Sequence, residues 1–129
     1  FLRVCTYFAN TIFIKAFNRL PNKAYRLQEI VNEEDSYTIL LSHRPELFEV
    51  YTESKVDLVL SGHAHGGQWR IPGLLNGLYA PNQGIFPKYA GGRYGSEDMT
   101  MIVSRGLARE NTRVPRIFNR PELVVIDIE

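Results

Sequence analysis

The fold is set by the stretch YTILLSHRPELFEVYTESKVDLVLSGHAHGGQ, residues 37–68. Its two short, almost wholly apolar runs, Tyr37–Leu41 and Asp57–Leu60, are typical of strands buried on both faces of a parallel sheet. Pro45 suits the first turn of a helix, and apolar residues at helical spacing extend that helix to about Ser54. A strand, a helix and a second strand in this order predict a βαβ unit whose strands run parallel.

The sequence on either side extends this α/β prediction. Met99–Val103 and Leu123–Ile128 are further apolar runs, and each predicts another buried strand. We predict one or two strands of a second sheet in Phe1–Leu20, and the spacing of apolar residues after Asn22 predicts a helix. Gly66–Asp98 is rich in glycine and proline, and its aromatic residues favour a packed functional loop over a disordered one.

Composition places the chain among globular domains and excludes several classes. The 129 residues are 44% apolar and 22% charged, which suffices for one modest core. The net charge of +1 argues against nucleic-acid binding driven by bulk charge. A single cysteine, Cys5, excludes an internal disulfide framework and multi-cysteine metal sites. No apolar run reaches the roughly 20 residues of a membrane span. Because Phe1 is not a start residue, we expect the chain to begin partway into a longer protein.

All three histidines follow the two predicted parallel strands. His43 comes after the first strand, and His63 and His65 come after the second. Ligands bind outside the carboxyl ends of such strands, so these imidazoles are candidates for a divalent metal site. Glycines on both sides of the pair would let the backbone pass close to an ion. Structural or surface histidines remain the alternative.

The kind of metal chemistry is narrowed by what the sequence lacks. Barrel amidohydrolases share the H-x-H pattern but draw further histidines from later strands, and none follows His65. Zinc deaminases need cysteine ligands. A centre of three imidazoles alone would not explain the glycine-rich flanks. The class that remains is a multi-metal hydrolase whose other ligands lie elsewhere.

The segment LLSHRPELFEVYTESKVDLVLSGHAHGGQWRIPG, residues 40–73, closely resembles the C-terminal half of calcineurin-like metallophosphoesterases, nearest to a bacterial subfamily with a GHAHGGQ signature. The likeness continues through GIFPKYAGGRY, VSRGL and NRPELVVIDI, and covers roughly the last two-thirds of the chain. It implies the C-terminal half of a four-layer α/β/β/α sandwich, a mixed sheet with flanking helices. Residues 37–129 would be the matched core, and residues 1–36 a variable segment.

The resemblance also implies a centre of two divalent ions, Mn, Fe or Zn, that activates a bridging water for attack on a phosphate ester. His43 and His63 would bind one metal and His65 the other. The family's earlier motifs, D-x-H, G-D-x-x-D and G-N-H-[DE], have no counterpart here, so the bridging carboxylate and the general acid are missing. We therefore expect no catalytic residue in this chain, an incomplete or absent metal centre, and little or no turnover by the chain alone.

Residues beside the matched motifs are candidates for substrate binding. Arg44, Arg70 and Arg105 are suited to phosphate oxygens, although surface or loop-bracing roles are the alternative for each. Gln68 would orient a ligand or cap the loop. Asp57 and Asp98 stand at the starts of strands, the wrong end for this centre, and we expect them to be solvated or capping residues.

The predicted substrate is a small-molecule or lipid phosphate ester of the phosphodiester or pyrophosphate type, with no nucleic-acid partner. The other expected partners are the missing N-terminal half of the same enzyme and a second copy of the chain, paired through an exposed sheet edge. A cytoplasmic or membrane-associated location is expected. The alternatives are a non-catalytic domain that binds metal or a partner, and an amphipathic segment over Phe1–Leu20 that docks a partner or membrane.

Overall fold

The computed structural model describes the backbone of residues 11–15 and the full residues 37–107 and 115–127. The helix predicted after Asn22 lies outside the described residues, as does most of the segment Phe1–Leu20. None of the helices in the described part is long and apolar enough to cross a membrane.

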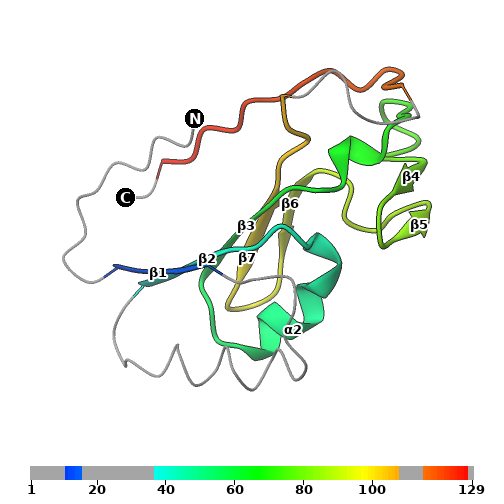
Figure 1. Ribbon diagram of the computed structural model, residues 1–129. Coiled ribbons are helices and arrows are strands. Elements are labelled where there is room, and N and C mark those ends of the chain that lie inside the picture. Colours follow the sequence, from blue (N-terminus) through cyan, green and yellow to red (C-terminus); the bar gives the residue numbers. More distant parts are fainter. Residues whose placement is uncertain (1–10, 16–36, 108–114, 128–129) are drawn as a thin grey trace.

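A five-stranded sheet forms the centre of the described structure (Figure 1). Its order is β1-β2-β3-β7-β6, in which every neighbouring pair is parallel except β6 with β7. The strands are β1 (Thr11–Lys15), β2 (Tyr37–Leu41), β3 (Leu58–Ser61), β6 (Gly92–Gly95) and β7 (Thr100–Val103). The predicted α/β class with a mixed sheet is confirmed.

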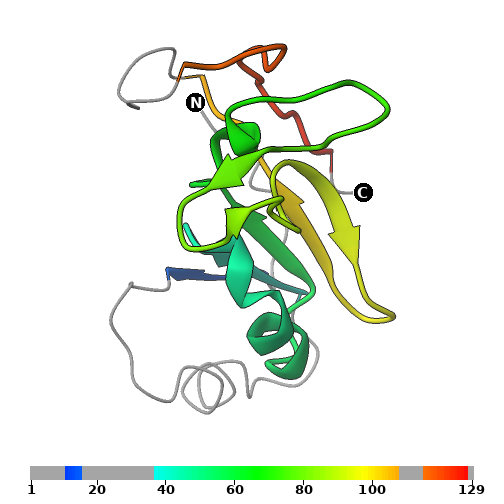
Figure 2. The same ribbon diagram turned by 90° about the vertical axis from the view of Figure 1, so that its right-hand side faces the viewer.

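The helix between β2 and β3 is also confirmed. It begins as a 3-10 turn, η1 (Pro45–Leu47), with proline at its start, and continues as α2 (Phe48–Glu53). The two views show α2 against one face of the sheet (Figure 2). Because the turn and helix carry the chain from the end of β2 to the start of β3, they bring the carboxyl ends of both strands to the same edge.

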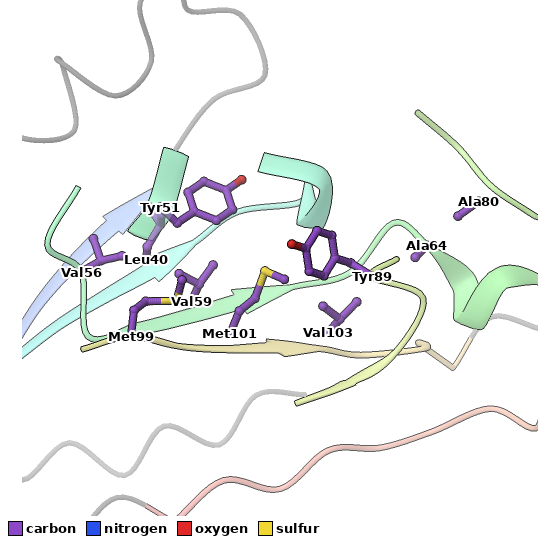
Figure 3. Packing of buried hydrophobic residues seen from close by; sticks show 10 residues of the cluster. All are labelled: Leu40, Tyr51, Val56, Val59, Ala64, Ala80, Tyr89, Met99, Met101 and Val103. Carbon is purple, nitrogen blue, oxygen red and sulfur yellow. The ribbon is translucent and has the colours of Figure 1, made fainter. Parts of the chain in front are cut away.

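The core lies between the sheet and α2. Leu40, Val59 and Met101 occupy one register row across β2, β3 and β7, and all three are 0% exposed. Tyr51 from α2 and Tyr89 from the loop before β6 belong to the same buried cluster (Figure 3). Burying a side chain of this size stabilises the fold by about 1.5–3 kcal/mol, so this row holds β2 and β3 in the register that the site requires.

The opposite face of the sheet is only half covered. A groove of about 380 Å³ lies between it and the C-terminal segment, with Leu41, Leu60 and Ile102 among its lining residues. The prediction of a buried strand over Leu123–Ile128 is wrong for the described residues 123–127. These have no strand partner, and the side chains of Leu123 and Val125 are 62% and 76% exposed.

Two further expectations need correction. The described strand in Phe1–Leu20, β1, pairs with β2 in the same sheet and does not belong to a second one. The segment Gly66–Asp98 is more regular than a loop, because it contains β6 and the hairpin of β4 (Tyr79–Ala80) with β5 (Gly84–Ile85). It is packed as expected, since the rings of Tyr89 and Tyr94 meet edge to face with centroids 5.0 Å apart.

Candidate metal site

His43 and His63 come together at the carboxyl edge of the sheet. Each follows one of two parallel, hydrogen-bonded strands, β2 and β3, and their ring centroids are 4.7 Å apart at an interplanar angle of 58°. The His43 ring is also the nearest group to Gly62, where an added Cβ would lie 3.7 Å from its Nδ1. The predicted convergence of side chains at neighbouring strand ends is therefore found for this pair.

The loop that carries His43 is held from behind by the helix. The hydroxyl of Tyr51 donates to the backbone oxygen of Arg44 at 2.6 Å and lies 2.6 Å from the hydroxyl of Ser42. Tyr51 is 1% exposed, and its burial raises the pKa of its hydroxyl to about 12. This neutral hydroxyl therefore holds the backbone of Arg44 after His43 and the side chain of Ser42 before it.

The backbone around the H-x-H pair adopts an unusual conformation. His63, His65 and Gln68 have φ values of 68°, 48° and 59°, in the left-handed region that costs a non-glycine residue about 1–2 kcal/mol. The 3-10 turn η2 (His65–Gly67) lies inside this stretch. Residues whose backbone is held in a sparsely populated conformation cluster at functional sites, where the surrounding structure maintains that conformation.

Asn119 supplies that support. Its carboxamide is 3% exposed and donates to the backbone oxygens of His65 at 2.7 Å and Gln68 at 3.1 Å. A Cβ on Gly66 would lie 2.3 Å from Asn119 Oδ1, so only glycine fits beneath this side chain. Asn119 therefore sets the path of the backbone that presents His65.

The chain segment before Asn119 reinforces the same loop. Ile117 forms a parallel bridge with Trp69, in which Arg70 N donates to Ile117 O at 3.0 Å and Ile117 N donates to Gln68 O at 3.1 Å. The indole Nε1 of Trp69 donates to Pro115 O at 3.1 Å. Residues 115–119 thus run beside the loop that carries His63 and His65, which we call the histidine loop, as the two ribbons at the upper right of Figure 1 show.

The ring of His63 is oriented by a hydrogen bond. Asn82, in the turn between β4 and β5, has its Nδ2 at 2.9 Å from Nε2 of His63. In this contact the amide nitrogen donates and Nε2 accepts, so the neutral ring carries its proton on Nδ1. Binding of a metal at Nδ1 requires the Asn82 carboxamide to turn, so that its oxygen accepts a hydrogen bond from Nε2–H.

Two of the three histidines are biased towards the neutral form. Burial, followed by the neighbouring His43, lowers the pKa of His63 below its ordinary value. Burial, followed by the charge of Arg116, lowers the pKa of His65. Neutral imidazole is the form that binds a divalent ion, so the lowered pKa values of His63 and His65 favour metal binding by these two rings.

The described residues do not complete a coordination sphere. Among residues 37–107 and 115–127, no three histidine, cysteine or acidic side chains lie close enough to hold one metal ion. The assignment of His43, His63 and His65 as metal ligands therefore stays a prediction, supported by the contact of the first two.

The predicted substrate-binding side chains are engaged with protein groups. Arg44 Nε forms an ion pair with Glu46 Oε1 at 2.5 Å, and Arg105 Nη2 with Glu122 Oε1 at 2.8 Å. Gln68 is 3% exposed and caps η2. Asp57 accepts a hydrogen bond from Thr38 N at 2.6 Å at the opposite end of the strands, which agrees with its expected structural role.

Sequence reasoning missed three residues of this region. Asn82 contacts His63, which is 19 residues away in the sequence, and Asn119 contacts His65, which is 54 residues away. Arg116 acts on the pKa of His65 from a similar distance along the chain. Asn119 stands at the start of NRPELVVIDI, whose resemblance to the family was the one available signal.

The chain is similar to several curated bacterial proteins. It is 35% identical over 94 residues to the uncharacterized metallophosphoesterase YkuE of Bacillus subtilis, which is 72% of this chain and 31% of that protein. It is 32% identical over 105 residues to an uncharacterized metallophosphoesterase of Aquifex aeolicus, 78% of this chain and 37% of that protein. It is 30% identical over 90 residues to the phosphodiesterase YaeI of Escherichia coli, 70% of this chain and 32% of that protein.

The chain thus spans between 31% and 37% of the length of these three relatives. No protein-family model matches it. No solved structure matches it either.

Proposed function

Because the chain is related to the calcineurin-like metallophosphoesterases, we propose that it forms the His-bearing part of a metal-dependent hydrolase of phosphate esters. The observation that carries the proposal is the contact of His43 with His63 at adjacent strand ends. The relatives named as metallophosphoesterases support a general dependence on divalent metal.

In the proposed site, His43 and His63 hold one metal ion and His65 contributes to a second. When bound, two such ions lower the pKa of a water and neutralise charge on the phosphoryl oxygens. In this proposal the histidines of this chain bind the ions, and neighbouring residues orient the histidines. Tyr51 fixes the backbone beside His43, Asn82 orients the ring of His63 through Nε2, and Asn119 holds the backbone of His65.

The proposed substrate is a small-molecule or lipid phosphate ester of the phosphodiester or pyrophosphate type. Arg44 and Arg105 are proposed to contact it at the rim of the site; the proposal is not extended to Gln68, whose side chain is 3% exposed. For Arg44 and Arg105 this requires a phosphate oxygen to share the guanidinium with the carboxylate that now pairs with it. Since the described residues hold no carboxylate placed to bridge two metals, we also propose that this chain alone turns substrate over slowly or not at all.

A second candidate is a domain that binds a single ion, or a partner, without catalysis. The absence of a three-residue metal group among the described residues favours it over a complete centre. Self-association through an edge strand of the described sheet, β1 or β6, is a further proposal for the partner.

The test is calorimetric titration of the protein with Mn²⁺ and Zn²⁺, followed by assay of bis(p-nitrophenyl) phosphate hydrolysis with each metal. We expect metal binding that is lost in His43→Ala and His63→Ala but kept in Asp98→Asn, an exposed residue at the far end of the sheet. Metal binding without hydrolysis by this chain agrees with both candidates, and measurable hydrolysis refutes the second. Equal binding by the histidine variants and the unchanged protein refutes the assignment of the site.

A further inference from the structure

Three arginines from distant parts of the sequence gather beside the histidine loop. Arg70 follows this loop, and its backbone N–H bonds Ile117, the residue after Arg116. Arg105 follows β7, and Nη2 of Arg116 donates to its backbone oxygen at 2.7 Å. All three side chains are partly exposed. These bonds therefore bring Arg70, Arg105 and Arg116 together beside the segment that supports the His65 turn.

The charges of this cluster are not balanced within the described residues. Glu122 is the carboxylate that contacts it, through both the side chain and the backbone N–H of Arg105. Arg70 donates to a neutral acceptor, Asn76 Oδ1, at 2.6 Å. Among the described residues, Arg116 donates to the backbone oxygen of Arg105. Within residues 37–107 and 115–127, three positive groups thus face one negative group.

The hydrogen-bond inventory of the cluster is also incomplete. Arg105 Nε and Arg116 Nη1 are shielded from water and have no acceptor in the described structure. Buried donors without a partner are rare in native proteins and cost about 1–3 kcal/mol, more on charged groups. Arg44, on the other side of the site, contrasts with them because Glu46 neutralises it.

The pKa values agree with an excess of positive charge. Burial, followed by the charge of Arg105, lowers the pKa of Arg70, and the same two causes lower the pKa of Arg116. After burial, Arg116 is also the main cause of the lowered pKa of His65, which places this guanidinium within electrostatic reach of the proposed metal ligand. An anion bound here would relieve the repulsion and lie next to the site.

We infer that Arg70, Arg105 and Arg116 form a subsite for a second phosphate group of the substrate, which makes pyrophosphate-type esters the preferred substrate class. Guanidinium groups bind phosphate oxygens through paired hydrogen bonds, and three of them suit a group carrying more than one charge. The inference rests on the proposed function for the identity of the substrate. The binding of the anion itself requires no metal.

The first test measures anion binding without catalysis. Metal is removed from the protein on a chelating resin, and inorganic pyrophosphate and orthophosphate are titrated calorimetrically. We expect tighter binding of pyrophosphate, and a loss of about tenfold in affinity in Arg116→Gln and in Arg70→Gln, the change expected from one charge-assisted contact. Arg93→Gln is the matched control, because Arg93 lies on β6 and contacts Thr100.

Two further variants, Arg116→Lys and Arg70→Gln, still test the inference if Arg116→Gln does not fold. The lysine keeps the charge but loses the paired geometry, so partial recovery of affinity is expected. Arg70→Gln loses one contact with Asn76 on the surface. Equal affinity of the native protein for pyrophosphate and orthophosphate overturns the inference, and so does unchanged pyrophosphate affinity in both glutamine variants.

The second test uses the metal-loaded protein. The kcat/KM for a diphosphate ester, relative to that for bis(p-nitrophenyl) phosphate, is expected to fall about tenfold in Arg116→Gln. Two diphosphate esters are compared as substrates, a nucleoside diphosphate sugar in solution and a lipid-linked diphosphate in micelles. The comparison distinguishes a soluble diphosphate substrate from a membrane-bound one. A constant ratio overturns the inference. Equal metal binding by His43→Ala, His63→Ala and the unchanged protein, with pyrophosphate binding retained, refutes the proposed function and leaves the anion subsite standing.

Discussion

The contact between Gly66 and Asn119 leads to a quantitative prediction for the histidine loop. Gly66 has a φ of 66°, and an added Cβ would meet three atoms of the Asn119 carboxamide at 2.3–2.8 Å. Gly66→Ala therefore meets two costs: about 1–2 kcal/mol for the left-handed backbone, and about 1–3 kcal/mol for overpacking. We expect it to lower the free energy of unfolding by roughly 2–5 kcal/mol.

Asn119→Ala separates these two costs. On its own it loses two hydrogen bonds, to His65 O and Gln68 O, and is expected to destabilise the fold by about 2 kcal/mol. It also removes the atoms that an alanine at position 66 would strike. The double variant should therefore cost about 1–3 kcal/mol less than the sum of the single variants.

The assay is equilibrium unfolding in urea for the four proteins of this double-mutant cycle. Gly84→Ala is the matched control, because Gly84 has a φ of 75° but no atom within 4 Å of the added Cβ, so it measures the backbone cost alone. The reasoning fails if the two substitutions add within about 0.5 kcal/mol, or if Gly66→Ala costs no more than Gly84→Ala.

Three further predictions concern the site. The pKa of Tyr51 is about 12 in the fold and 10.0 when exposed, so the unfolded chain ionises first and the free energy of unfolding should fall as pH rises through this interval. Tyr51→Phe should reduce that slope in pH-dependent urea unfolding, and the raised pKa of Tyr37 should maintain the remainder. Asn82→Ala should weaken Zn²⁺ binding about tenfold or more, because His63 loses its orienting partner, and an unchanged calorimetric Kd contradicts this. Zn²⁺ at about 100 times its Kd should stabilise the protein by about 2.7 kcal/mol; a thermal shift of the same size in His43→Ala would exclude that residue as a ligand.

The parts of the fold that the sequence predicts are those set by local pattern. The apolar runs at Tyr37–Leu41 and Asp57–Leu60, with Pro45 between them, were sufficient for the parallel pair and its helix. Because the histidines follow these strands directly, their shared edge could also be predicted. The contact of His43 with His63 follows from the register of β2 and β3.

What the sequence left open depends on contacts between distant segments. Leu123–Ile128 has the composition of a buried strand, but the described residues of this segment lie beside a half-covered face and make no ladder. Asn119 and Arg116 are ordinary residues in an irregular segment, and their roles arise only when residues 115–119 meet the loop after His65. No local periodicity encodes such a meeting.

The indole of Trp69 has a practical consequence. It is the single tryptophan of the chain, 40% exposed, and its nitrogen donates to Pro115 O across the seam between the histidine loop and residues 115–119. Intrinsic fluorescence excited at the indole band therefore comes from this one seam. Separation of the two segments would move the emission to longer wavelength while the far-ultraviolet circular dichroism of the sheet is still unchanged, so the protein carries its own optical reporter of an intact site.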